Sequence, residues 1–209
     1  RYLVRTAPDI QGIAARDVGL KAMGPLPFAD GMSYRIMHGF KETWEADKNP
    51  FNKTMGAVAW RGPTGFLIDA YMDYESRPGP YDRSTWQFLV GKKTAQYTLG
   101  FEYTNQDRGE DPDLELATVM GVMKLGGPWS VMGQLHRLFK PSVKGNDIAY
   151  IPFDPTAKAT NLVAGLEYRF NNHFTLSPNI VWTHYSVNES GVRPDDDVHV
   201  RLTFYVNFE

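Results

Sequence analysis

The sequence predicts an all-β fold, an antiparallel transmembrane β-barrel to which this chain contributes about 11–12 strands. Three observations predict it. Apolar and polar residues alternate with a period of two along most of the chain. The connections between these segments alternate between short and long, and aromatic residues gather near the segment ends. Together they indicate strands with one face for lipid and the other for water.

The C-terminal segment, residues 197–209, shows the alternation most clearly. It runs for about a dozen residues, which is about what a tilted strand needs to cross a bilayer. One face carries His199, Arg201, Thr203, Tyr205 and Asn207, and the other carries Val198, Val200, Leu202, Phe204, Val206 and Phe208. Such a segment resembles the closing strand of outer-membrane β-barrel proteins, which usually ends on an aromatic residue.

Ten further segments are expected to form strands. No window shows an apolar stripe with a 3.6-residue period, and no run approaches eighteen apolar residues, so helices are expected to be absent or short. The alternation does not assign faces to residues 54–60 or 114–125. The expected strands are residues 17–23, 32–40, 54–60, 66–74, 86–90, 95–104, 114–125, 129–135, 162–170 and 174–182.

The connections sort by length. Transmembrane barrels have tight turns at one end and long loops at the other, whereas a soluble β-sandwich has no reason to sort its loops. A sandwich remains the residual alternative, and solubility without detergent would establish it. The short connections are residues 25–30, 61–64, 92–94, 126–128 and 171–173, and the long ones are 41–53, 75–84, 105–113, 140–158 and 188–196.

Aromatic residues lie near the ends of the expected strands, as the interfacial girdles of a barrel require. Aromatic residues are common in any β-strand, so it is the sorted connections that favour the girdle interpretation. The girdle candidates are Tyr34, Phe40, Phe66, Tyr74, Trp86, Tyr103, Trp129, Phe139, Phe170, Phe174, Trp182 and Phe208.

The bulk composition agrees with this fold. The chain has 209 residues, a formal net charge of −2 and no cysteine. Its negative mean hydropathy is compatible with a barrel because lipid-facing and lumen-facing residues alternate. The near-neutral charge and the lack of a Lys/Arg cluster argue against nucleic acid as a partner. No cofactor is implied.

A family resemblance follows from residues 15–26, which read ARDVGLKAMGPL, and residues 31–40, which read GMSYRIMHGF. They resemble a segment midway through the phosphate-selective porin O/P type family, where an Arg-Asp-x-Gly-hydrophobic strand leads by a short turn into a Gly-x-x-Tyr strand. The resemblance implies a homotrimeric porin of about sixteen strands. The expectation is one β-barrel domain over residues 1–209 that lacks N-terminal strands, because residues 1–5 are too short to cross a bilayer.

Alternation alone selects nine pore-lining candidates. They carry both signs of charge, which predicts a water-filled pore with modest selectivity. The Lys/Arg ladder of the porin O/P family is not visible among them, so phosphate specificity is not carried over. Pairing of Glu167 and Arg169 with neighbouring strands, which would hold the wall together, is an equally good account of those two. The candidates are Lys21, Arg35, Asp69, Asp73, Glu102, Glu167, Arg169, His199 and Arg201.

Two other patterns suggest chemistry. His184 and Ser186 lie two apart on the lipid side of a strand, which resembles the His-x-Ser arrangement of outer-membrane phospholipase, where histidine activates serine. No oxyanion donor or calcium site accompanies them. Residues 195–197 and 107–113 are acidic; they either bind divalent cations shared with lipopolysaccharide or are simply solvated loops.

The expected function is that of a bacterial outer-membrane porin, not an enzyme, which lets small polar solutes or ions diffuse passively. Its partners are expected to be outer-membrane lipid and lipopolysaccharide, the solutes, and two further copies in a homotrimer. The alternatives are a non-conducting structural barrel that anchors a partner, and a phospholipase that uses His184 and Ser186. Channel recordings distinguish the first alternative, and Ser186→Ala tests the second.

Overall fold

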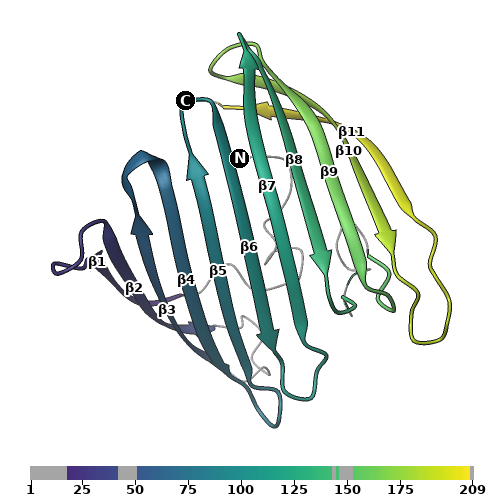
Figure 1. Cartoon of the computed structure of the whole chain (residues 1–209). Coiled ribbons are helices and arrows are strands. Elements are labelled where there is room, and N and C mark those ends of the chain that lie inside the picture. Colours follow the sequence, from purple (N-terminus) through teal and green to yellow (C-terminus); the bar gives the residue numbers. More distant parts are fainter. Residues whose placement is uncertain (1–17, 42–50, 143–144, 146–152, 208–209) are drawn as a thin grey trace.

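The computed structural model describes residues 18–41, 51–142, 145 and 153–207. In this part of the chain eleven antiparallel strands form one sheet, and each strand pairs only with its neighbours in the sequence (Figure 1). The strands are β1 (Val18–Pro25), β2 (Met32–Lys41), β3 (Phe51–Arg61), β4 (Phe66–Ser76), β5 (Arg83–Lys93), β6 (Tyr97–Asp107), β7 (Leu114–Gly126), β8 (Trp129–Leu138), β9 (Ala159–Arg169), β10 (Phe174–Tyr185) and β11 (Asp197–Val206).

The sheet curves strongly along its width, and its β1 and β11 edges do not meet (Figure 1). The connections β1–β2, β3–β4, β5–β6, β7–β8 and β9–β10 lie at one end of the strands, the short-turn end, and span two to six residues. The connections at the other end, the long-loop end, span six to twenty residues. The predicted all-β antiparallel fold is therefore confirmed. The sorting of connections by length is confirmed in part, because β4–β5 and β6–β7 have six residues each and are no longer than β1–β2. The expected stub, residues 1–5, lies outside the described residues.

Several strands extend further into the long connections than the alternation suggests. β4 continues to Ser76, β6 to Asp107 and β10 to Tyr185. Backbone hydrogen bonds between strands do not require apolar side chains, so the pairing continues beyond the apolar band at the long-loop end. The β5–β6 turn also falls later than expected. There the Thr94 hydroxyl accepts hydrogen bonds from the backbone N–H groups of Gln96 and Tyr97, which sets the turn at residues 94–96.

The two faces of the sheet differ in polarity. In β4, Ile68, Met72 and Tyr74 are exposed on the convex outer face, whereas Asp73 and Glu75 are buried on the concave inner face. The same parity runs through the sheet and leaves outer residues such as Leu20 and Val200 more than four-fifths exposed. Carboxylates thus face inward and apolar groups face outward. This arrangement is the reverse of that in a water-soluble protein.

Apart from the single residue Gly145, helical structure in the described residues is limited to the 3-10 turn Pro63–Gly65. No helix there is both long enough and apolar enough to cross a membrane.

Aromatic side chains touch one another at both ends of the outer face. At the short-turn end, the Trp129 and Tyr168 rings lie 4.6 Å apart, and Tyr168 is 4.5 Å from Phe170, measured between ring centroids. At the long-loop end, Trp86 lies 5.0 Å from Tyr103. Two such rows bordering an apolar band agree with the predicted girdles. Of those candidates, Phe208 and the side chain of Phe40 lie outside what the structure describes.

The inner face is apolar in one region, at the long-loop end of β7–β10. Leu116, Leu138 and Val163 point inward and are at most 1% exposed. Phe153 and Ala157, from the β8–β9 connection, pack against them. Apolar residues that point inward here explain why the alternation in residues 114–125 assigns no face.

Candidate functional site

The hollow of the sheet holds a cavity of about 310 Å³ on the inner side of β1–β5. On this face β3 presents the small side chain of Ala57 between Arg35 on β2 and Tyr71 on β4, which carry longer side chains. Three of the predicted pore-lining residues, Lys21, Arg35 and Asp69, line this cavity together. Its other lining residues are Ile36, Met37, Met55, Gly56, Ala57, Tyr71 and Gln87.

Ion pairs neutralise both aspartates in this region. Arg35 Nη2 lies 2.6 Å from Asp69 Oδ2. Asp73 Oδ2 lies 3.0 Å from Lys53 Nζ, with both side chains more than nine-tenths buried. The Tyr71 hydroxyl also donates to Asp73. Lys21 has no carboxylate partner within the described residues, so it leaves the cavity with a positive charge.

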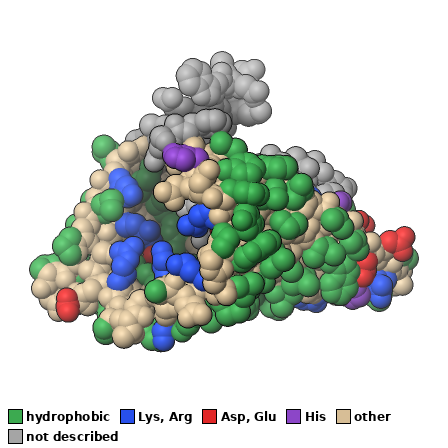
Figure 2. Space-filling view, turned by 90° about the horizontal axis from the view of Figure 1, so that it is seen from above, with side chains coloured by type: hydrophobic (Ala, Val, Ile, Leu, Met, Phe, Trp, Pro, Cys, Tyr) green, Lys and Arg blue, Asp and Glu red, His purple; other side chains and the backbone are tan. Residues whose placement is uncertain are grey.

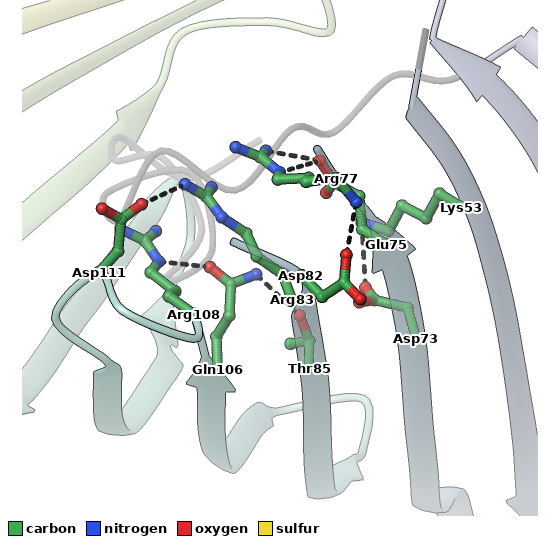
Figure 3. Close-up of polar contacts among 10 residues, drawn as sticks. All are labelled: Lys53, Asp73, Glu75, Arg77, Asp82, Arg83, Thr85, Gln106, Arg108 and Asp111. Carbon is green, nitrogen blue, oxygen red and sulfur yellow. Dashed lines mark hydrogen bonds and ion pairs between the residues drawn. The ribbon is translucent and has the colours of Figure 1, made fainter. Parts of the chain in front are cut away.

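An arginine network caps the inner face of β4–β6 at the long-loop end (Figure 3). Arg77 pairs with Glu75, and Arg83 pairs with Asp111. Arg108 donates from Nε to the Gln106 amide oxygen over 2.7 Å. Burial, followed by the nearby positive charge of Arg83, lowers the pKa of Arg108 to about 10. The group stays charged at neutral pH, and two of the three arginines of the network have carboxylate partners.

A second group of cations lies at the short-turn end. Arg61, Lys93, Lys124 and Arg169 occupy the last inward-facing position of β3, β5, β7 and β9 and are exposed. Arg169 pairs with Glu167 over 3.6 Å, and the other three make no ion pair with any residue that the structure describes. We call these four the rim cations. Figure 2, seen from this end, shows lysine and arginine side chains gathered over the hollow.

Three of the rim cations, Arg61, Lys93 and Lys124, are absent from the predicted pore-lining residues. Arg61 and Lys93 fall within segments expected to be turns, and Lys124 falls in a segment without assigned faces. One signal in the sequence could have found them, because a basic residue stands just before or at each of these short turns.

All nine predicted pore-lining residues face the inner side of the sheet. They do not form one site. Glu102 is buried on β6, the Glu167–Arg169 pair lies on β9, and His199 and Arg201 lie on β11, beyond the cavity of β1–β5.

His184 and Ser186 face outward, as predicted, but they do not form a nucleophile–base pair. His184 Nδ1 lies 3.1 Å from Asp196 Oδ1, and the Ser186 hydroxyl accepts from Arg137 Nη2 over 3.3 Å. Among the described residues no hydrogen bond joins the serine to the histidine. Asp196 orients the imidazole, but the serine is held by a different strand.

The acidic loops are largely occupied by basic side chains. Lys140 Nζ lies 2.5 Å from Asp113 Oδ2, and this hydrogen bond lowers the pKa of Asp113. Arg83 forms an ion pair with Asp111, and Arg193 forms one with Asp196. The residues that the structure describes contain no group of three side chains able to hold a metal ion.

No protein-family model matches this chain, and no curated protein sequence does. Solved structures do match. An anion-selective porin from Comamonas acidovorans superposes with a TM-score of 0.61 and 11% sequence identity, over 89% of this chain and 58% of that chain. In vitro folded OmpT, an outer membrane protein of Vibrio cholerae, gives a TM-score of 0.54 in its trimer form, with 14% identity over 90% of this chain and 62% of that chain. A second OmpT structure gives 0.53, with 13% identity.

This chain thus spans about three-fifths of the length of these three chains. At such low identity the likeness concerns the fold. That fold, with its apolar outer face bordered by aromatic rows, places the chain in the bacterial outer membrane as part of a β-barrel.

Proposed function

We propose that this chain forms the wall of a water-filled outer-membrane channel through which small polar solutes and ions diffuse, with a preference for anions. The observation that carries the proposal is the excess of cations on the inner face, in a chain whose formal net charge is −2. The inward strand residues include the cations Lys21, Arg35, Lys53, Arg61, Arg83, Lys93, Lys124, Arg169 and Arg201, against the carboxylates Asp69, Asp73, Glu75, Glu102, Glu167 and Asp197.

The excess of cations lies at the mouth of the proposed channel, where solutes would pass. Most inner carboxylates are already paired with basic groups, whereas Arg61, Lys93 and Lys124 are exposed at the short-turn mouth without ion-pair partners among the described residues. A mouth lined by one sign of charge concentrates counter-ions and speeds their entry. Anions would therefore be favoured over cations, and the mixed interior behind the mouth would keep the selectivity modest.

The channel would need further strands. The outer edges of β1 and β11 have no partner strand within the described residues, and lipid cannot satisfy an open sheet edge. We propose that strands of the same polypeptide close the barrel at about sixteen strands. A homotrimer and membership of the phosphate-selective porin O/P type family belong to this proposal. They rest on residues 15–40, and for the trimer also on the trimer form of the Vibrio cholerae neighbour.

Reversal potentials across planar bilayers test the channel. In a KCl gradient the protein should pass chloride more readily than potassium. A double variant that combines Lys93→Gln and Lys124→Gln should have a chloride-to-potassium permeability ratio about twofold lower. Lys140→Gln, at the long-loop end and paired with Asp113, is the matched control. An unchanged ratio in the double variant would remove the rim cations from the mechanism.

A non-conducting structural barrel is the second candidate. The β8–β9 connection supports it, because Phe153 and Ala157 fill part of the inner face. Absence of channel events from folded protein would establish this role in place of the porin. We propose no catalytic role, because Ser186 is bound to Arg137 rather than to His184. Phospholipid hydrolysis that is lost in Ser186→Ala would contradict that view.

A further inference from the structure

One outward-facing row of the sheet is polar although it borders the apolar band. Arg137 on β8 lies opposite Thr160 on β9, and Thr160 lies opposite His184 on β10. The ladder continues one step further, where the Ser186 N–H donates to the Lys158 carbonyl over 2.9 Å. These residues therefore form one patch on the outer face at the long-loop end.

Arg137 is the unusual member of this patch. Its guanidinium donates to the Thr160 hydroxyl over 2.7 Å and to the Ser186 hydroxyl over 3.3 Å. No carboxylate of the described chain forms an ion pair with Arg137 or with Lys158. Arg193, in the nearby β10–β11 connection, does have a carboxylate partner. The patch thus holds a half-buried, uncompensated positive charge beside two hydroxyl groups.

The position of the patch indicates what neutralises that charge. The next outward row toward the middle of the band is Leu135, Leu162 and Trp182, and Leu135 and Trp182 are at least 40% exposed. Tryptophan at the edge of an apolar band marks the headgroup level of a bilayer. In a barrel the long loops face the cell exterior, so this headgroup level is that of the outer leaflet.

We propose that Arg137, supported by Lys158, Thr160 and Ser186, binds the phosphate group of an outer-leaflet lipid. A guanidinium offers paired N–H donors that match phosphate oxygens, and the two hydroxyls can rotate to donate as well. The acyl chains of the lipid would lie over Leu135, Leu162 and Trp182. This site differs from a bridge between acidic loops and lipopolysaccharide because it needs no divalent cation. It does not depend on whether the barrel conducts.

Native mass spectrometry of the folded protein, extracted in mild detergent, tests the site. The probes are bisphosphorylated lipid A and the same lipid after removal of its phosphates. The phosphorylated lipid should bind about tenfold more tightly than the dephosphorylated one. Arg137→Gln should abolish this difference, and Arg193→Gln, a neighbouring exposed arginine already paired with Asp196, should retain it.

Three results would overturn the proposal. The first is equal binding of the two lipids by the unmodified protein. The second is an undiminished preference in an Arg137→Gln variant that still shows the heat-modifiable band of a folded barrel. The third is complete displacement of the lipid by millimolar inorganic phosphate, which would assign the patch to a free anion. Should Arg137→Gln fail to fold, Lys158→Gln, on an exposed loop residue, should weaken the preference in its place.

Discussion

The Tyr185 hydroxyl accepts a 3.1 Å hydrogen bond from the backbone N–H of Asp154. It also donates to Asp197 over 2.6 Å, so one side chain of β10 joins the β8–β9 connection to the start of β11. Asp154 follows Phe153, which is 1% exposed against the inner face. The polar bond and the apolar contact hold the same end of this connection inside the curve of the sheet.

Phe153→Ala should therefore destabilise the fold. It removes a ring from a fully buried cluster, and such truncations cost about 3–5 kcal/mol of unfolding free energy. Phe28→Ala, at an 83% exposed turn position, should cost little. The measurement is the temperature at which the compact band of unboiled protein is lost on a gel. Equal temperatures for both variants would mean that Phe153 is not anchored.

Removing one partner of the Lys53–Asp73 pair should be costly. Both side chains are buried, and Lys53→Met leaves an uncompensated carboxylate, at a cost of about 3–5 kcal/mol. Lys53→Met combined with Asp73→Asn should be less destabilised than the sum of the single variants. The free energies of unfolding for this double-mutant cycle can be measured by urea unfolding monitored by tryptophan fluorescence. Strict additivity would show that the two groups do not interact.

Acid should release the segment before β11. Hydrogen bonds to Asp196, first from His184 and then from Trp182, hold the pKa of Asp196 below its ordinary value of 3.8. A carboxyl whose folded pKa is lowered stabilises the fold above its ordinary pKa, and this contribution is lost as pH falls through the folded value. Tryptophan fluorescence should therefore change at a pH below 3.8. Asp196→Asn should lack that change, and a transition that persists in the variant would belong to another group.

Substitution by alanine should have different effects on stability at two strand glycines. A Cβ on Gly165 would meet the Pro178 carbonyl oxygen at 2.8 Å, so Gly165→Ala should shift the β9–β10 pairing and lower stability. A Cβ on Gly56 meets nothing within 4 Å. Gly56→Ala should be neutral, or stabilise by about 0.5–1 kcal/mol because glycine loses more backbone entropy on folding. Thermal loss of the compact band compares the two.

The strands and most of their faces could be predicted because alternation is a local property of the sequence. Leu116 could not be assigned a face, since the residue that covers it, Phe153, comes from a later connection. Arg61 and Lys93 were missed because pairing with β4 and β6 carries β3 and β5 into expected turns. The His-x-Ser motif suggested a catalytic pair, whereas the partner of Ser186 is Arg137 on another hairpin.

Every strand of this sheet pairs only with the strands before and after it in the sequence. Two adjacent strands and their turn thus form a module whose removal or duplication leaves the other registers intact. Lineages of such proteins can consequently widen or narrow their bore by gaining or losing whole hairpins, without rethreading the chain.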